Sequence, residues 1–253
     1  MAGELKGKVT LVTGAACGIG KAAALLFAQE GGRLMLADID GDGAERTAAL
    51  VRANGGEAKA IRTDVTDRSA VNALVAATMD AYGDLECAFN NAGTGHAPTS
   101  LLDMDDKVWD WQIALNLSSA LYCMQAQIPI MIERGGGRIV NTASLAGMAA
   151  TPKMSGYCAA KHGLIGLSKT AAAEFVGQNI RVNLVCPTAT ASEGMIEYIE
   201  KSGADPARFN GPMGRMGQPV EQAQVALWLL SDRSSYVTGQ AIVANGGSGG
   251  QTA

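Results

Sequence analysis

The sequence predicts an α/β protein built on one parallel β-sheet that carries helices on both faces. Short runs rich in Val, Ile and Leu alternate along the whole chain with longer Ala-rich stretches of helical character. The short runs are continuously apolar, which is typical of strands that helices cover on both sides. No linker, internal repeat or low-complexity segment interrupts the 253 residues. The sequence therefore indicates one domain over residues 1–253, with a doubly wound sheet of about seven strands.

The first half of the chain alternates regularly between predicted strands and helices. KVTLVTG predicts a buried strand, and the helix after it, GIGKAAALLFAQEGG, is closed by glycine. RLMLADID, AKAIRTD and LECAFNNAG are the following apolar runs. The strands are predicted at 8–14, 33–40, 58–64 and 85–93, and the helices at 18–32, 42–54 and 67–82.

The second half continues the alternation but contains one irregular segment. Pro129 is expected to interrupt the long helical segment at 105–134, because proline cannot donate a backbone hydrogen bond. Residues 188–218 contain many Gly and Pro residues and no clean period, which predicts a mobile loop with short helices that closes over a substrate. The remaining strands are predicted at 137–144, 180–187 and 240–245, and the remaining helices at 155–177 and 219–231.

Composition and charge argue against several classes of protein. The net charge of −4 provides no basic surface for nucleic acid. The opening MAGELKGKVTLVTGAA lacks a signal segment, and no run of 18 apolar residues occurs, so we expect a cytoplasmic protein without membrane attachment. The five cysteines are dispersed, which indicates free thiols in a reducing compartment. With two histidines and no paired ligand spacing, we expect no metal site.

A glycine-rich turn connects the first predicted strand to the first helix. The stretch TGAACGIG contains Gly14, Gly18 and Gly20, with Cys17 and Ile19 between them. Glycines let the backbone approach a pyrophosphate, and a helix N-terminus offers free N–H groups and a positive dipole end. The alternative is a turn in which the glycines serve packing alone. Its position between strand and helix favours a dinucleotide site in a Rossmann-type fold.

Asp38 ends the second predicted strand, eighteen residues beyond Gly20. A carboxylate at this position can accept hydrogen bonds from the adenosine ribose of a dinucleotide. A 2′-phosphate would be repelled by about 4 kcal/mol per charge pair at ~4 Å and an effective dielectric of ~20. We therefore predict NAD rather than NADP as the cofactor, by tenfold or more after solvent screening. The alternative is an ordinary aspartate that caps the next helix.

Further motifs appear in order along nearly the whole chain. Asp64-Val65 follows the third strand, NNAG occupies 90–93, and Asn116 lies in the long helix. Ser144 follows the fifth strand, and Tyr157 precedes Lys161 by four residues. In this order and spacing, the sequence resembles the short-chain dehydrogenases/reductases. The resemblance implies that Asp64 and Val65 contact the adenine and that Asn91, Ala92 and Gly93 line the cofactor cleft.

Two places depart from the pattern of the family. The sixth strand ends in Pro187-Thr188, where the family usually has Pro-Gly, and Thr188 restricts a backbone that glycine would leave free. Further downstream, Thr190 and Ser192 stand where the family usually has a branched apolar residue and a threonine that both face the nicotinamide. Near the C-terminus, Asn245 replaces the usual aspartate of Asp-Gly-Gly.

Tyr157 and Lys161 share one face of a predicted helix because they stand four residues apart. Oxidation of an alcohol needs a base near neutral pH, and free tyrosine with pKa ~10 is about three units too weak an acid. A lysine ammonium at ~4 Å would supply roughly 4 kcal/mol, or about three pKa units. The resemblance further implies that Lys161 binds the nicotinamide ribose, Ser144 binds the substrate oxygen, and Asn116 holds a water that relays protons.

These observations predict an NAD-dependent alcohol dehydrogenase or ketone reductase. One alternative is a 3-oxoacyl-thioester reductase, against which Asp38 and the acidic balance of charges argue. Another is a non-catalytic NAD-binding sensor or scaffold, against which the intact Ser144, Tyr157 and Lys161 argue. Apolar residues of the 188–218 loop suggest a hydrophobic secondary alcohol, cyclic or aromatic; they are Met195, Ile196, Tyr198, Phe209, Met213 and Met216.

The resemblance also implies a homotetramer that packs through the two long helices at 105–134 and 155–177. Both helices are apolar over most of their length, as expected for helices buried on more than one side. His162 projects away from Lys161 round the helix and is interpreted as structural, whereas His96 is a candidate for substrate contact.

Overall fold

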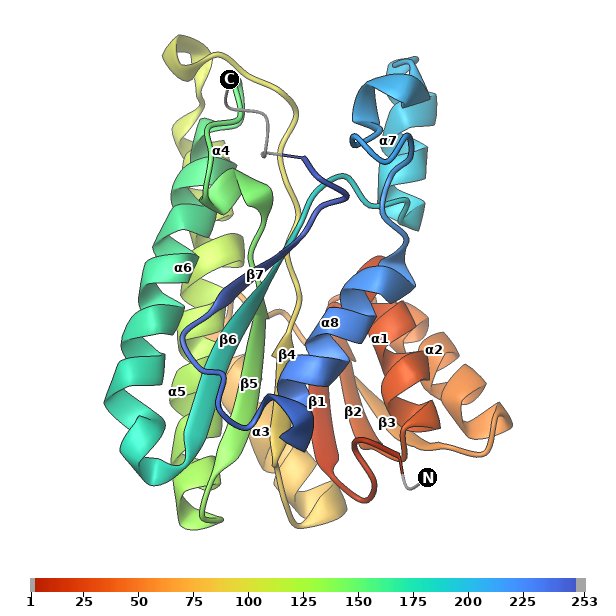
Figure 1. Ribbon diagram of the computed structural model, residues 1–253, viewed down its shortest axis with the longest axis vertical. Coiled ribbons are helices and arrows are strands. Elements are labelled where there is room, and N and C mark those ends of the chain that lie inside the picture. Colours follow the sequence, from red (N-terminus) through yellow and green to blue (C-terminus); the bar gives the residue numbers. More distant parts are fainter. Residues whose placement is uncertain (1–2, 249–253) are drawn as a thin grey trace.

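Seven parallel strands form one sheet in the computed structural model, which describes residues 3–248 (Figure 1). The strand order is β3-β2-β1-β4-β5-β6-β7, and every neighbouring pair is parallel. This arrangement confirms the predicted doubly wound sheet of seven strands with helices on both faces. The strands are β1 (Val9–Thr13), β2 (Arg33–Asp38), β3 (Glu57–Arg62), β4 (Cys87–Asn90), β5 (Gly137–Thr142), β6 (Ile180–Pro187) and β7 (Ala241–Ala244).

Helices cover both faces of the sheet and bury an apolar cluster on each side. On one face lie α1 (Gly18–Gln29), α2 (Gly41–Ala53) and α8 (Pro219–Leu230). On the other lie α3 (Arg68–Tyr82), α5 (Ser119–Glu133) and α6 (Ser155–Phe175). Successive residues of β1 pack into the apolar clusters on opposite faces of the sheet. Leu11 packs with α3 and α5, whereas Val12 packs with α1 and α8. Because both faces of the sheet are covered, the central strands β1 and β4 are buried along their whole length, whereas the edge strand β3 is partly exposed.

The order of the strands reverses between β1 and β4, and this reversal positions the site. The chain winds from β1 toward β3 in one direction and from β4 toward β7 in the other. In such sheets ligands bind in the crevice beyond the carboxyl ends of the strands at the reversal. Two short helices, α4 (Asp106–Ile113) and α7 (Glu193–Ser202), lie beyond this edge, and α7 with a 3-10 turn at Pro206–Phe209 occupies the segment predicted as a loop with short helices (Figure 1).

The predicted interruption at Pro129 is wrong. Helix α5 continues through Pro129. Both Pro129 and Gln125, whose carbonyl loses its usual donor, are exposed, so water can replace the missing hydrogen bond. The irregularity lies earlier, where a π-helical segment at Ala114–Ser118 separates α4 from α5. Segments of this kind are frequently found at functional sites.

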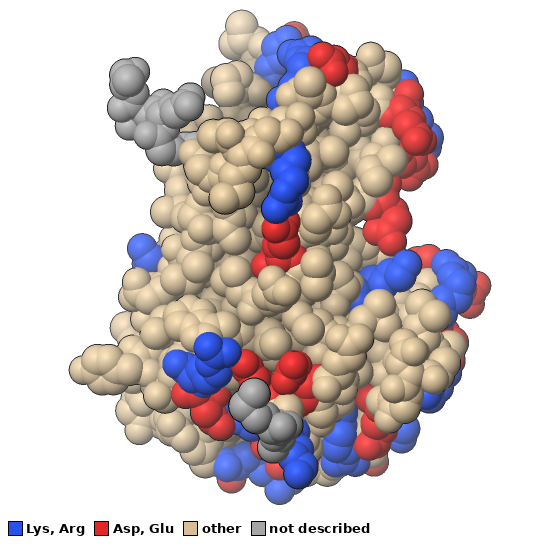
Figure 2. Space-filling model, turned by 45° about the vertical axis from the view of Figure 1, so that its right-hand side comes forward, with Lys and Arg blue, Asp and Glu red and all other residues tan. Residues whose placement is uncertain are grey.

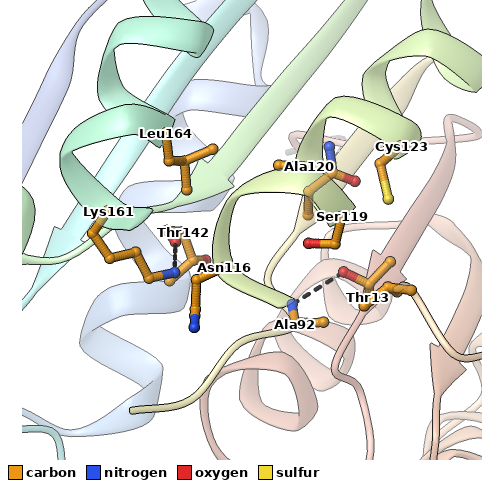
Figure 3. A pocket seen from close by; sticks show the side chains of 11 residues that line it. Thr13, Ala92, Asn116, Ser119, Ala120, Cys123, Thr142, Lys161 and Leu164 are labelled. Atoms are coloured by element: carbon orange, nitrogen blue, oxygen red, sulfur yellow. Dashed lines mark hydrogen bonds between the residues drawn. The ribbon is translucent and has the colours of Figure 1, made fainter. Parts of the chain in front are cut away.

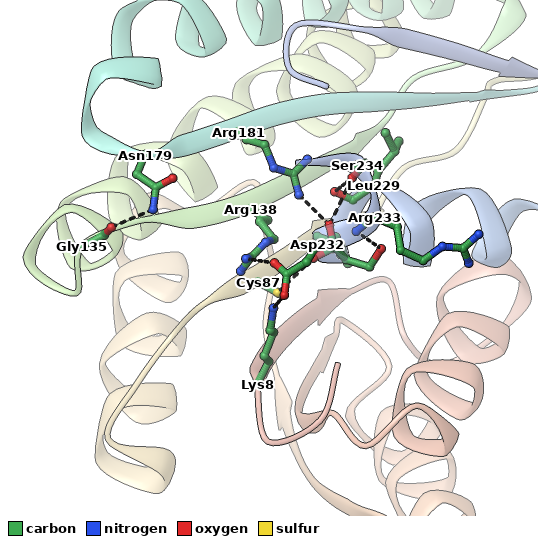
Figure 4. A network of polar contacts seen from close by, with 12 residues as sticks. Lys8, Cys87, Gly135, Arg138, Asn179, Arg181, Leu229, Asp232, Arg233 and Ser234 are labelled. Carbon is green, nitrogen blue, oxygen red and sulfur yellow. Dashed lines mark hydrogen bonds and ion pairs between the residues drawn. The ribbon is translucent and has the colours of Figure 1, made fainter. Parts of the chain in front are cut away.

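A polar network closes the opposite, amino-terminal end of the sheet (Figure 4). Asp232, just after α8, pairs with Lys8 at 3.1 Å and with Arg138 of β5. Arg181 of β6 donates to the Val237 carbonyl at 3.1 Å and to the Ser231 carbonyl at 3.0 Å. The hydrogen bond from Lys8 and the charge of Arg138 hold the pKa of Asp232 below its usual value. The network joins the segment after α8 to β5, to β6 and to Lys8, which directly precedes β1.

The surface carries charges of both signs, interspersed over the face that Figure 2 presents. Within residues 3–248, no helix is long and apolar enough to cross a membrane. The same residues contain no group of three or more His, Cys, Asp or Glu side chains placed to hold a metal ion.

Candidate active site

The glycine-rich turn folds back on itself at the end of β1. Gly14 and Gly18 have φ angles of +67° and +55°, which disfavour residues with a side chain. A Cβ at Gly14 would lie 2.9 Å from Ala92 Cα, and a Cβ at Gly20 would lie 1.9 Å from the Gly14 carbonyl oxygen. Tight packing therefore requires these glycines whether or not a phosphate binds. Burial raises the pKa of the Cys17 thiol, aided by the Glu193 and Asp38 carboxylates, which disfavours a reactive thiolate.

Substitution Gly20→Ala should lower the free energy of unfolding by about 1–3 kcal/mol, because the new methyl would overlap the Gly14 carbonyl. Urea denaturation measures the change. The matched control is Gly166→Ala in α6, where nothing lies within 4 Å of the added Cβ. That variant should gain about 0.5–1 kcal/mol, since alanine is the better helix former. Equal stability of the two variants would contradict the described turn.

Asp38 lies at the carboxyl end of β2 with its carboxylate held in place. One oxygen accepts from the Ala16 N–H at 2.9 Å and the other from the Asp40 N–H at 3.0 Å. These bonds leave further lone pairs on both oxygens. Asp40, not Asp38, caps helix α2, since its side chain accepts from the Gly43 N–H. The helix-capping alternative for Asp38 is therefore wrong.

An open hollow of about 370 Å³ adjoins the end of β2 and is lined by Ile39, Asp40, Gly41, Asp42 and Arg62. Arg62 comes from β3 and donates from Nε to the Ile39 carbonyl at 3.1 Å. The sequence shows no arginine soon after Asp38, but the pairing of β2 with β3 brings this one beside it. The hollow is large enough for a planar ring system next to a ribose.

Asn91 ties three strand ends together at the reversal. Its side-chain amide donates to the Thr13 and Gly14 carbonyls at 3.2 and 3.3 Å, and its oxygen accepts from the Thr142 hydroxyl at 3.1 Å. The Thr13 hydroxyl in turn accepts from the Asn91 N–H and from the Ala92 N–H, the second of which Figure 3 shows. Asn91 therefore shapes the crevice by joining β1 and β5 to the loop after β4.

Lys161 is buried beside Tyr157 on helix α6. Its side chain is 2% exposed, and Nζ donates to the Thr142 carbonyl at 2.7 Å (Figure 3). Nζ also lies 5.5 Å from the centre of the Tyr157 ring. Burial lowers the pKa of Lys161 to about 8. The ammonium thus bridges β5 and the tyrosine in a poorly solvated position.

The expected lowering of the Tyr157 pKa by Lys161 is not observed. Although part of the side chain is exposed, burial raises the pKa of Tyr157 above its usual value, and hydrogen bonding to Ser144 only partly offsets this. The prediction assumed a lysine near 4 Å in a moderately polar environment. Desolvation of the phenol dominates instead. Ser144, which also accepts from the Ala146 N–H at 3.1 Å, is the hydroxyl that reaches Tyr157.

The π-helical segment presents Asn116 to the same space. Its side-chain amide donates to the Thr94 carbonyl at 3.0 Å and to Gln112 Oε1 at 2.9 Å. Its oxygen is buried and has no partner. A Cβ at Gly93 would lie 2.7 Å from that oxygen and 3.2 Å from Lys161 Nζ. Any side chain at this position would therefore crowd the Asn116 oxygen and the Lys161 ammonium.

A small cavity lies between Asn116 and Lys161 (Figure 3). Its volume is about 10 Å³, which is close to the space that one water molecule needs. Thr13, Val65 and Thr142 also line it. The unpartnered Asn116 oxygen and the Lys161 ammonium provide polar groups for such a water.

Comparison with known proteins identifies the family. Residues 14–249 match the family model described as enoyl-(acyl carrier protein) reductase, one of the models of the short-chain dehydrogenases/reductases. The chain belongs to the short-chain dehydrogenase/reductase family. Its members use nicotinamide cofactors, and the chain is accordingly an oxidoreductase of the dehydrogenase/reductase type.

Relatives within the family match over almost the full chain. Cyclohexanol dehydrogenase from Acinetobacter sp. (strain SE19) is 39% identical, over 97% of this chain and 96% of the relative. The 3-oxoacyl-[acyl-carrier-protein] reductase FabG from Thermotoga maritima is 40% identical, over 96% of this chain and 98% of the relative. The crystal structure of levodione reductase superposes with a TM-score of 0.93 at 32% identity, over 98% of this chain and 99% of the other.

Thr188, which departs from the pattern of the short-chain dehydrogenases/reductases, is accommodated without strain. Among the described residues, the non-glycine positions with positive φ are Lys153 and Asn179. Thr188 therefore needs no glycine-like backbone. Pro187 and Thr190 are buried next to it, and the Thr190 hydroxyl donates to the Thr188 carbonyl at 3.1 Å. The Ser192 hydroxyl caps α7 by accepting from the Met195 N–H at 3.3 Å.

Asp64 and Val65, both expected to contact the adenine, differ in burial in the structure. Asp64 is exposed at the end of β3, where it accepts from the Thr66 N–H and hydroxyl at 2.9 and 2.7 Å. Val65 is buried and lines the cavity near Asn116. His162 is exposed and contacts the Cys158 carbonyl on its own helix. His96 contacts the Ala97 carbonyl through Nδ1, and its Nε2 is buried without a partner.

Sequence reasoning missed four residues of the site. Thr13 and Thr142 hold the strand ends through backbone and hydroxyl contacts. Arg62 and Glu193 reach the dinucleotide crevice from β3 and α7. Thr13 is the first residue of the TGAACGIG stretch, which drew attention to its glycines and gave Thr13 no role. The signals for the other three lie in long-range pairing and could not be recognised locally.

Proposed function

We propose that this chain is an NAD(H)-dependent oxidoreductase that interconverts a hydrophobic secondary alcohol, cyclic or aromatic, and its ketone. The observation that carries the proposal is the convergence of Ser144, Tyr157, Lys161 and Asn116 beside the crevice at the strand reversal. The relatives that act on cyclohexanol and on levodione support a ring-shaped substrate.

The crevice suits a nicotinamide dinucleotide. The N-terminal turn of α1, with its glycine loop, fits a pyrophosphate, the Asp38 carboxylate fits a ribose, and the open hollow beside Arg62 fits an adenine. Gly93 leaves Lys161 and Asn116 accessible to the second ribose. The bound cofactor would supply or accept the hydride.

In ketone reduction, Tyr157 would donate its proton to the carbonyl oxygen while Ser144 holds that oxygen by a hydrogen bond. The raised pKa of Tyr157 means that the phenol carries its proton at neutral pH and has one to donate. In alcohol oxidation the same group must first lose its proton. The raised pKa opposes this loss, and Lys161, with Nζ 5.5 Å from the centre of the Tyr157 ring, would be the cation of this chain that favours the phenolate. A water in the cavity between Asn116 and Lys161 would carry the proton away.

The substrate end of the crevice is formed by the 188–218 segment. The Tyr198 and Phe209 rings pack edge to face with centroids 6.2 Å apart. Ile196 and Met213 are exposed, which is costly on a free surface and favourable against an apolar substrate. These side chains support the hydrophobic substrate class.

Nicotinamide absorbance during turnover tests the cofactor. With cyclic, aromatic and aliphatic secondary alcohols and their ketones, we expect NAD to be preferred over NADP by about tenfold or more, because Asp38 repels a 2′-phosphate. Asp38→Asn should narrow this preference, and Asp84→Asn, a carboxylate near the opposite end of the sheet, should leave it unchanged. A preference for NADP in the unaltered chain would contradict the role of Asp38.

The 3-oxoacyl-thioester reductase remains the second candidate because the relative from Thermotoga maritima is 40% identical. Turnover of a 3-oxoacyl thioester with NADPH, faster than of any cyclic ketone with NADH, would favour it. A non-catalytic sensor would bind NADH tightly and turn over no substrate of the panel. The homotetramer and the cytoplasmic location stay predictions.

A further inference from the structure

A carboxylate from the substrate segment occupies the N-terminus of α1. Glu193, the first residue of α7, accepts through Oε2 from the Gly18 N–H at 2.7 Å. Its Oε1 lies 3.2 Å from Lys21 Nζ, one turn further along α1. The two ends of this contact are 175 residues apart in the chain. Figure 1 places α7 beyond the carboxyl edge of the sheet, on the side of α1 and α8.

Glu193 supplies the cap that the helix lacks locally. Cys17 is the N-cap residue of α1 and makes no side-chain capping bond. Two preceding N–H groups are committed to strand β2, since Ala15 donates to the Ala37 carbonyl and Ala16 donates to the Asp38 carboxylate. The first N–H of the helix therefore points at an anion that belongs to the chain itself, where the helix dipole favours negative charge.

The contact brings the start of α7 directly onto the phosphate turn. A Cβ at Gly18 would lie 3.1 Å from Ser192 Cβ. Burial raises the pKa of Glu193, but hydrogen bonds from its own N–H, from Gly18 and from Lys21 outweigh this, so the pKa is lower than usual and the side chain is an anion at neutral pH. Its side chain is 56% exposed, so it can move into solvent.

We propose that Glu193 is an internal competitor for the pyrophosphate of the dinucleotide and thereby couples cofactor binding to the substrate segment. The inference rests on the proposed function. A pyrophosphate that binds the Gly18 N–H displaces the carboxylate, because the two anions repel each other and need the same donor. The release frees the start of α7, whose own N-cap bond from Met195 to Ser192 does not involve Glu193.

Cofactor affinity tests the competition without any turnover. Isothermal titration of NADH should give a Kd that is about threefold to tenfold lower for Glu193→Gln and Glu193→Ala than for the unaltered chain, the range of one exposed charge-assisted contact. Glu197→Gln is the matched control, because Glu197 lies on the same helix but pairs with Lys201. Its Kd should equal that of the unaltered chain.

The outcomes separate this inference from the function on which it rests. NADH binding with an unchanged or higher Kd in both Glu193 variants would overturn the inference alone, and it would show the contact to be a cap that supports the site. Failure of the unaltered chain to bind NADH would overturn the proposed function and the inference with it.

Hydrogen exchange supplies a second readout, with ADP as a probe that carries a diphosphate but no nicotinamide. In the unaltered chain, ADP should speed amide exchange in residues 192–202, because displacement of Glu193 loosens the start of α7. In Glu193→Ala the exchange should already be fast and should not rise further. Slower or unchanged exchange in the unaltered chain at saturating ADP would overturn the coupling.

Discussion

Replacement of Tyr157 by phenylalanine should lower kcat by about 10³-fold or more, while the Kd for NADH stays within about twofold. General acid–base groups contribute about 10²–10⁴-fold, and Tyr157 is the titratable side chain that hydrogen-bonds to Ser144. Phenylalanine keeps the ring that packs beside Lys161 but lacks the hydroxyl group that would donate or accept the proton. Steady-state turnover of the best ketone and titration with NADH measure the two quantities separately.

The matched control for this variant is Tyr236→Phe. Tyr236 lies after α8 with its side chain fully exposed, so loss of its hydroxyl should leave both quantities unchanged. Full activity of Tyr157→Phe would show that the Tyr157 hydroxyl is not the acid or base of the reaction. Loss of NADH binding in that variant would instead indicate a structural role for the hydroxyl.

Replacement of Lys161 by methionine should abolish turnover and yet stabilise the fold by about 1–2 kcal/mol at pH 7. Burial lowers the pKa of Lys161 from 10.5 to about 8, so holding the ammonium charged at pH 7 costs about 3 kcal/mol. Loss of the hydrogen bond to the Thr142 carbonyl should reduce this stabilisation by about 1 kcal/mol. Urea denaturation at pH 7 measures the net change.

The pH dependence of stability provides an independent check on the same residue. Between about pH 8 and pH 10.5 the unfolded chain retains a proton that folded Lys161 has released. The contribution of this group to the free energy of unfolding therefore rises with pH across that window and is constant below it. In Lys161→Met, the free energy of unfolding should no longer rise across this pH window on account of residue 161.

Lys169→Met is the control for the lysine variant. Lys169 lies two turns further along α6 and is exposed, so it carries no comparable desolvation penalty. Its replacement should change the free energy of unfolding by less than about 0.5 kcal/mol. A destabilised Lys161→Met, with Lys169→Met unchanged, would mean that the ammonium contributes net stability through its contacts.

Much of the fold could be predicted because its signals are local. Short apolar runs specify most of the seven strands, and the central ones are buried on both faces. The four-residue spacing of Tyr157 and Lys161 places both on one side of α6, as helical geometry requires. The resemblance to the family also located Ser144 and Asn116 in the chain before any contact was known.

Other features depended on surroundings that the local sequence does not specify. Pro129 breaks no helix because the carbonyl that it leaves without a donor faces water. The Tyr157 pKa moves upward because desolvation dominates, and Lys161, 5.5 Å from the ring centre, does not offset it. Both errors came from rules that assume an average environment.

The sequence by itself determined the order of the elements, the glycine turn and the residue types of the site, because periodicity and spacing act over a few residues. Only the tertiary structure decided which groups meet there. Strand pairing placed Arg62 beside Asp38. A π-helical turn placed Asn116 beside Lys161. Packing of α7 placed the Glu193 carboxylate on the Gly18 N–H, 175 residues away in the chain. Contacts of this kind arise from packing of the whole chain, which also sets the burial that shifts each pKa.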